Sequence, residues 1–239
     1  MSVCCVLMAA GSGTRLGLGP KGMVRVGGRS LLARALDGLA GAGVEDIVLV
    51  LPPESHRLPA DVYPAAGLVS VCGGPTRQES VRLGLAALSP QADVVLVHDA
   101  ARCLTPARVI ADVIATVLAG AEVVVPVVPL TDTLRWATGG CDEPAPARER
   151  LVAVQTPQGF AREVLLRAHQ VAHECGVRAT DDATLAEQLG HQVRLTEGDE
   201  LAFKVTQPLD LTLAEALVAA QAPVAQQCAP GNADEDGQR

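Results

Sequence analysis

The chain has 239 residues and a formal net charge of −8 at pH 7, and 49% of its residues are hydrophobic while only 2% are aromatic. This length suits one α/β domain with a core of Ala, Val and Leu, and the acidic balance argues against general nucleic-acid binding. No apolar run approaches a membrane span and no secretory signal is evident, so we expect a cytoplasmic protein with no membrane partner. The seven cysteines include no C-x-x-C pair, which argues against a disulfide framework or a zinc knuckle.

Apolar runs alternate with helical patterns through the first 130 residues. Strands are predicted at residues 3–8, 46–51, 68–72, 93–98 and 121–128, and helices at 30–42, 76–88 and 106–118. Because the apolar runs are continuous, we expect each strand to be covered on both faces. The repeated βα units predict a Rossmann-like α/β fold, with a mostly parallel central sheet and helices on both faces. Ligands in such folds bind at the carboxyl ends of the strands.

The pattern changes after Pro129. Residues 130–155 contain several Gly and Pro between two strand-like pieces, at 133–136 and 151–155, and predict a protruding β-hairpin arm. An exposed arm has edges to cover, and dimerisation is one solution. Helices are then expected at 161–175 and 182–189, strands near 192–196 and 201–206, and a last helix that begins at Pro208. We expect one domain over residues 1–220 and a disordered polar tail over 221–239.

The segment from Ala9 to Lys21, AAGSGTRLGLGPK, follows the first apolar run. Arg15 and Lys21 add two cations, and Pro20 stiffens the loop just before the lysine. Small residues leave backbone N–H groups free to approach phosphate oxygens; they are Ala9, Ala10, Gly11 and Gly13. The combination predicts a site for a nucleoside triphosphate. The purely structural alternative is a strand-to-helix turn whose charges are incidental.

Two other phosphate loops do not fit this segment. A Walker A loop requires G-x-x-x-x-G-K-[ST], whereas Lys21 stands between Pro20 and Gly22. A dinucleotide fingerprint requires G-x-G-x-x-G, but Leu16 occupies the third glycine position. Arg15 and the Pro20-Lys21 pair are therefore the features of this segment that most specifically indicate a triphosphate site.

Several later stretches are ambiguous when each is taken alone. The stretch GGPTRQES at 73–80 predicts either a turn with an N-cap at Thr76 or an exposed backbone segment that hydrogen-bonds the edge of a base. VHDAAR at 97–102 places Asp99 at a strand end, where it can cap a turn, meet a ribose hydroxyl or bind a metal. His169 and His173 have the spacing of metal ligands, but no third ligand is near, so we interpret them as a pair on a helix surface.

Taken in order, seven stretches resemble the 2-C-methyl-D-erythritol 4-phosphate cytidylyltransferase family of the non-mevalonate isoprenoid pathway. The resemblance covers about residues 3 to 217, and its motifs are AAGSGTR…PK, GGPTRQESV, VHDAAR, DT, TPQ, TDDA and FKVT-P-DL. It implies a transferase that moves CMP from CTP to the sugar phosphate with Mg²⁺, which the CTP phosphates hold mainly. It also implies a homodimer formed through the arm.

The resemblance assigns roles to residues of this sequence. Arg15 and Lys21 match the cations that stabilise the transition state at the α-phosphate. Lys204 matches a lysine that positions the acceptor phosphate. The arm arginine that reaches the partner's site is matched by Arg148, with Arg150 as a rival. The remaining matches are Ala9, Ala10, Gly11, Gly13, Gly74 and Ser80 for the nucleotide, and Asp99, Arg102, Thr156 and the partner's Thr133 for the acceptor.

The sequence departs from the family pattern at Gly22, Met23, Cys103 and Arg135, which affects substrate fit more than reaction type. Ribitol-5-phosphate cytidylyltransferases use similar motifs and are the nearest alternative. A sugar-1-phosphate nucleotidyltransferase that uses UTP or GTP, and a non-catalytic nucleotide-binding regulator, are the further alternatives.

Overall fold

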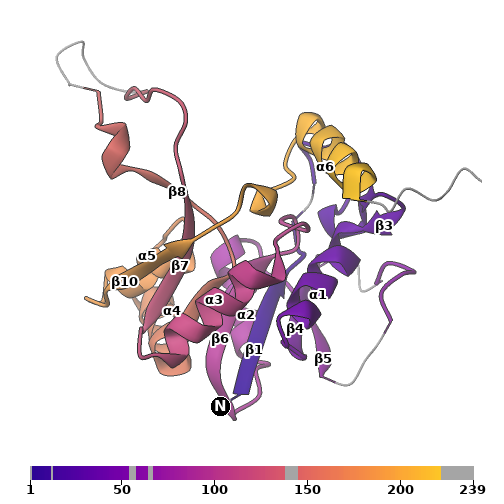
Figure 1. Cartoon of the computed structure of the whole chain (residues 1–239). Helices are drawn as coiled ribbons and strands as arrows, with labels where there is room; N and C mark the ends of the chain where they lie inside the picture. Colours follow the sequence, from indigo (N-terminus) through magenta and orange to yellow (C-terminus); the bar gives the residue numbers. More distant parts are fainter. Residues whose placement is uncertain (1, 12, 54–57, 64–66, 138–144, 222–239) are drawn as a thin grey trace, which may run out of the picture.

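The computed structural model describes residues 2–11, 13–53, 58–63, 67–137 and 145–221. Its centre is an eight-stranded sheet in the order β10-β7-β9-β6-β1-β4-β5, and β8 pairs with β7 (Figure 1). The strands of this sheet are β1 Ser2–Met8, β4 Asp46–Leu51, β5 Leu68–Cys72, β6 Ala92–Asp99, β7 Val123–Pro129, β8 Val152–Val154, β9 Gln158–Ala161 and β10 Val193–Glu197. Pairing is parallel except where β8 and β9 meet their neighbours. The predicted α/β class with a mostly parallel sheet is confirmed.

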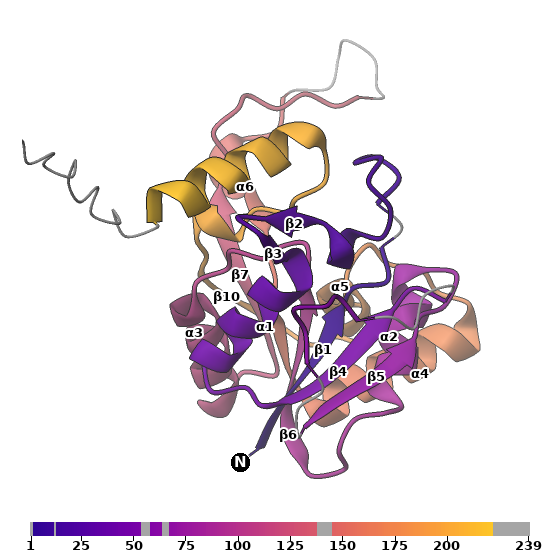
Figure 2. The same ribbon diagram turned by 90° about the vertical axis from the view of Figure 1, so that its right-hand side faces the viewer.

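Two helical layers enclose the sheet. One apolar cluster joins α1 and α3 to one face, and a second joins α2, α4 and α5 to the other. Figure 2 shows helices on both sides of the sheet. Cys4 and Cys5 belong to different clusters because successive residues of a strand point to opposite faces. The helices are α1 Leu31–Gly41, α2 Arg77–Leu85, α3 Ala107–Leu118, α4 Arg162–Cys175, α5 Asp182–Glu187 and α6 Pro208–Gln221. None of the described helices is long and apolar enough to cross a membrane.

A third, smaller cluster lies under α6. Here α6 packs on a short hairpin of β2 (Arg25–Val26) and β3 (Arg29–Ser30), which the sequence patterns did not predict. Figure 2 shows α6 lying across this hairpin. Leu16, Val24 and Val205 are buried in the cluster. The loop after β1 and the segment that carries Lys204 therefore share one small core.

Three strand predictions need correction. The run at 68–72 is the edge strand β5, and its Val69, Ser70 and Cys72 side chains are exposed, so it is not covered on both faces. Residues 201–206 form no strand. Instead a 3-10 helix, Glu200–Ala202, begins where the Asp199 carboxylate accepts a 2.7 Å bond from the Leu201 amide. The extended chain that follows donates a backbone hydrogen bond to the neighbouring loop, from the Val205 amide to the Ala101 carbonyl at 2.9 Å.

The third correction concerns the arm. It projects from the body beside β8, as Figure 1 shows, but residues 133–136 form no strand. The antiparallel pairing occurs at its base, where Val152–Val154 lies against Val127–Pro129. The pairing ends at Pro129, and the described arm residues 131–137 are exposed apart from the half-buried Leu134. The expected disordered tail lies outside the described residues after Gln221.

Candidate functional site

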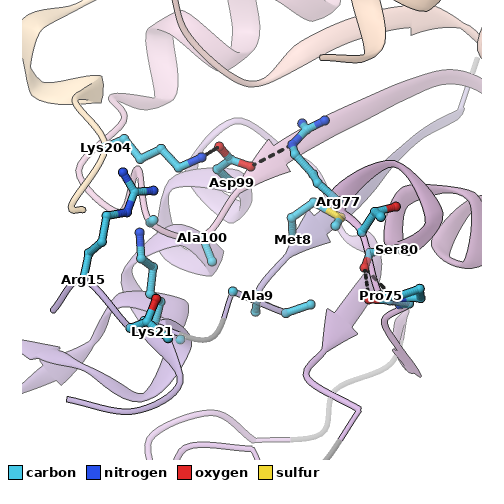
Figure 3. A pocket seen from close by; sticks show the side chains of 18 residues that line it. Met8, Ala9, Arg15, Lys21, Pro75, Arg77, Ser80, Asp99, Ala100 and Lys204 are labelled. Carbon is cyan, nitrogen blue, oxygen red and sulfur yellow. Dashed lines mark hydrogen bonds and ion pairs between the residues drawn. The ribbon is translucent and has the colours of Figure 1, made fainter. Parts of the chain in front are cut away.

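The carboxyl ends of β1 and β6 open into a cavity of about 300 Å³. Ten of the predicted site residues line it, together with Arg77, which the sequence reading had not selected. Figure 3 shows Arg15, Lys21 and Lys204 on one side of the cavity and Arg77 and Ser80 on the other. The predicted lining residues are Ala9, Ala10, Gly11, Gly13, Arg15, Lys21, Gly74, Ser80, Asp99 and Lys204.

The loop after β1 folds back so that Lys21 returns to the start of the segment. The Lys21 amide donates a 3.1 Å hydrogen bond to the Gly11 carbonyl, and the Leu16 amide bonds the Gly13 carbonyl at 2.9 Å. Gly13 has a φ of +67°, and a Cβ at this position would lie 2.0 Å from the Gly19 carbonyl oxygen. Only glycine satisfies both the backbone angle and the close approach.

The two lysines of the chain meet in this cavity. The Lys21 ammonium donates a 3.2 Å bond to the carbonyl of Val205, which follows Lys204. Burial and the positive charges of Lys204 and Arg15 lower the pKa of Lys21, against the opposing effect of Asp99 and Asp210. Positive charge is therefore concentrated here in a protein whose formal net charge is −8. Such a site favours a polyanionic ligand.

Asp99 lies at the end of β6 between two cations. Its carboxylate accepts a 2.6 Å bond from the Lys204 ammonium and lies 3.8 Å from Nε of Arg77. Burial by itself raises the pKa of Asp99, but the charges of Lys204 and Arg77 outweigh it and lower the pKa to about 2. Asp99 is the one carboxylate among the described residues that line the cavity, and it is ionised at neutral pH.

The turn before α2 forms the opposite wall. The Ser80 hydroxyl accepts a 3.0 Å bond from the Gly74 amide and lies 3.2 Å from the Gly74 carbonyl, so it shapes this turn. Thr76 is the N-cap, as predicted, and its side chain accepts a 3.1 Å bond from the Glu79 amide. A Cβ at Gly73 would lie 2.8 Å from the Ala10 side chain, so the two loops approach each other closely.

Thr156 and Arg102 lie outside the cavity lining and support it. The buried Thr156 hydroxyl accepts a 3.1 Å bond from the Asp99 amide and lies 2.9 Å from Nδ1 of His98. Burial lowers the pKa of His98 to about 4, so this ring is neutral at pH 7. Arg102 bonds the carbonyls of Ala202, at 2.6 Å, and Val154, at 3.1 Å. It therefore ties the segment that carries Lys204 to β8.

Thr133, Arg148 and Arg150 lie on the arm, away from the cavity of their own chain. The Arg148 side chain is 48% exposed, and its guanidinium donates a 3.0 Å bond to the Thr131 carbonyl. Within one chain these three residues therefore do not line the cavity.

The interpretation of His169 as part of a helix-surface pair is wrong. His169 is 2% exposed, and its Nε2 lies 3.0 Å from the buried Asp182 carboxylate, which also binds Arg77 at 2.8 Å. The sequence analysis did not select Arg77, because it assigned a possible role only to the backbone of the turn at 73–80. The sequence near Arg77 carried no signal for this role, because its buried partner Asp182 lies 105 positions later.

Comparisons with known proteins agree with one another. A family model described as 2-C-methyl-D-erythritol 4-phosphate cytidylyltransferase matches residues 3–220. A relative of that name from Rhodococcus jostii is 47% identical over 218 residues, covering 90% of this chain and 95% of the relative. Another from Streptomyces coelicolor is 47% identical over 233 residues, covering 90% and 84%.

A solved structure gives the same result for the fold. The enzyme of that name from Thermus thermophilus superposes with a TM-score of 0.78 at 39% identity, covering 92% of this chain and all of the other. The family match spans the loop of Lys21 and the segment of Lys204, which the fold brings to one cavity. The chain therefore belongs to the 2-C-methyl-D-erythritol 4-phosphate cytidylyltransferase family.

Proposed function

We propose that this enzyme transfers CMP from CTP to 2-C-methyl-D-erythritol 4-phosphate, giving 4-diphosphocytidyl-2-C-methyl-D-erythritol and pyrophosphate for isoprenoid precursor synthesis. The observation that carries the proposal is the meeting of Lys21, Arg15 and Lys204 in one cavity on an acidic protein. Family membership over residues 3–220 supports the substrate pair. The cytoplasmic location stays a prediction.

The reaction follows from charge. An oxygen of the acceptor's phosphate monoester attacks the α-phosphorus of CTP, the bond from that phosphorus to the α–β bridging oxygen breaks, and pyrophosphate leaves with the electron pair. The attacking dianion needs no side-chain nucleophile. The barrier lies in bringing two anions together and in the charge that grows on the leaving oxygen. Lys21 and Arg15 lower it by electrostatic stabilisation and alignment.

A divalent metal fits this cavity as a companion of the nucleotide. Among the described residues, no group of three or more His, Cys, Asp or Glu is arranged to hold an ion. Asp99 is already paired with Lys204 and lies beside Arg77. Mg²⁺ would therefore take its ligands from phosphate oxygens and water, as it commonly does. When bound, it would neutralise part of the triphosphate charge.

In this proposal Lys204 binds the acceptor's phosphate, and Asp99 accepts a hydrogen bond from an acceptor hydroxyl. We further propose a homodimer in which the arm of one protomer completes the site of its partner through Thr133 and Arg148. The exposure of Arg148 and of apolar arm residues supports this arrangement: Trp136 is 55% exposed and Val152 is 42% exposed.

The deciding experiment measures pyrophosphate release with CTP, Mg²⁺ and either methylerythritol phosphate or ribitol 5-phosphate. We expect release with the first acceptor and little with the second. The reverse result would assign the ribitol activity. Replacing CTP by UTP, GTP or ATP tests the sugar nucleotidyltransferase alternative. Binding of CTP without pyrophosphate release from any acceptor would indicate the regulator.

A further inference from the structure

Five charged or titratable side chains form a line through the wall of the cavity. The buried His169 lies 3.0 Å from one oxygen of Asp182, and the other oxygen of Asp182 accepts a 2.8 Å bond from Nη1 of Arg77. Arg77 lies 3.8 Å from Asp99, which binds Lys204 at 2.6 Å. Figure 3 shows the cavity end of this line, with Asp99 between Arg77 and Lys204.

Asp182 anchors Arg77 rigidly. The Asp182 side chain is 1% exposed, and it lies in the first turn of α5. Burial alone raises its pKa, but the bond to His169 and the charge of Arg77 outweigh this and lower the pKa, so the carboxylate is ionised. Removing the Arg77 guanidinium would leave the buried Asp182 carboxylate without its cationic partner, which is unfavourable. The guanidinium is thus fixed from behind while it faces the cavity.

The two cations around Asp99 differ in what else they can bind. Lys204 extends from an irregular segment and carries an ammonium whose free donors can turn to a phosphate. Arg77 is held by its 2.8 Å bond to the buried Asp182 carboxylate. When Lys204 engages the acceptor's phosphate, Arg77 stays beside Asp99 and keeps that carboxylate oriented.

We infer that Arg77 is a positioning residue for cytidylyl transfer, which, anchored by Asp182, orients the Asp99 carboxylate toward a hydroxyl of the acceptor polyol. The inference rests on the proposed function and adds a determinant of acceptor recognition that lies on a different loop from the lysines. It requires that Arg77 act through Asp99 and leave CTP binding nearly unchanged.

The test compares Arg77→Gln and Arg77→Lys with Arg82→Gln. Arg82 is a matched control because it lies on the same helix, α2, and pairs with Glu79 at 2.6 Å, outside the described lining of the cavity. We expect Arg77→Gln to raise the KM of the acceptor by about 10- to 100-fold, as misplacement of a binding group does. The Kd of CTP, measured by calorimetry, should change by less than about 2-fold because the cations of the nucleotide loop are intact. Arg77→Lys should recover part of the acceptor affinity, and Arg82→Gln should match the wild type.

A double-mutant cycle separates positioning from a merely structural link between α2 and α5. If Arg77 acts through Asp99, adding Arg77→Gln to Asp99→Asn costs little further acceptor affinity. The inference would be overturned if the acceptor KM of the double variant rose by the product of the two single-variant increases. It would also be overturned if Arg77→Gln left the acceptor KM unchanged, or weakened CTP binding as much as acceptor binding. An inactive wild type would instead refute the proposed function, so the two failures are distinguishable. Asp182→Asn should reproduce the acceptor effect, and if it does not fold, the Arg77 variants still decide.

Discussion

The Lys21 ammonium donates a hydrogen bond to the carbonyl of Val205, a residue 184 positions away along the chain. The contact joins the loop after β1 to the segment before α6. The ammonium groups of Lys21 and Lys204 lie at the same cavity. In the proposed reaction one of these segments binds the triphosphate and the other binds the acceptor's phosphate, so this contact would hold the two binding segments together.

We predict that Lys21→Ala or Arg15→Ala lowers kcat by at least about 10²-fold, because each removes a cation that stabilises charge developing in the transition state. Steady-state pyrophosphate release measures this loss. Thermal unfolding should stay near that of the wild type, since both side chains face the cavity. Arg29→Ala is a control for loss of a positive charge, because Arg29 pairs with Asp37 away from the cavity. Near-normal turnover of both Lys21→Ala and Arg15→Ala would show that these two residues do not stabilise the transition state.

Gly13 and Gly17 offer a matched pair for the loop. Their φ angles are +67° and +68°, but a Cβ at Gly13 would meet the Gly19 carbonyl at 2.0 Å, whereas a Cβ at Gly17 would meet nothing within 4 Å. Both alanine variants carry the backbone strain of about 1–2 kcal/mol. Gly13→Ala must also displace the loop, so we expect its KM for CTP to rise at least about 10-fold more than that of Gly17→Ala. Equal increases in the KM for CTP of the two variants would show that backbone strain alone accounts for the change.

The sequence was most informative where chemistry is local. Gly13, Arg15 and Lys21 could be assigned together because one short loop combines small residues with cations. Arg77 could not, because its partner Asp182 lies 105 positions later and α4 and α5 must pack before the two meet.

Element prediction failed for a related reason. The four residues of β9 carry Gln and Gly and look polar, yet this strand is buried between β6 and β7. A Cβ at Gly159 would lie 2.4 Å from the Val113 side chain, so the glycine allows α3 to approach the sheet. Short strands of this kind depend on tertiary packing, which single-sequence periodicity does not contain.

His98 predicts a pH dependence of stability. Its pKa is about 4 in the folded protein against 6.5 for the free side chain, so below pH 6.5 the unfolded state binds a proton that the folded state does not. Its contribution is complete above pH 6.5 and is lost as the pH falls toward 4. Between pH 7 and 4.5 the wild type should lose about 2–3 kcal/mol more unfolding free energy than His98→Asn. Urea titrations at both pH values measure this, and parallel losses in the two proteins would contradict it.

The arm provides the test of the proposed dimer. Arg148→Ala should raise the KM of the acceptor with little effect on CTP, and comparison with Arg150→Ala decides which arginine acts; an effect confined to CTP would reject both. The complementation assay uses an acceptor concentration at which neither the Arg148→Ala nor the Lys21→Ala homodimer turns over appreciably. If the arm acts on the partner's site, mixing these two variants produces heterodimers with one intact site. Random exchange then restores activity to about a quarter of the wild-type value. No restoration after verified subunit exchange would show that each arm serves its own chain or neither.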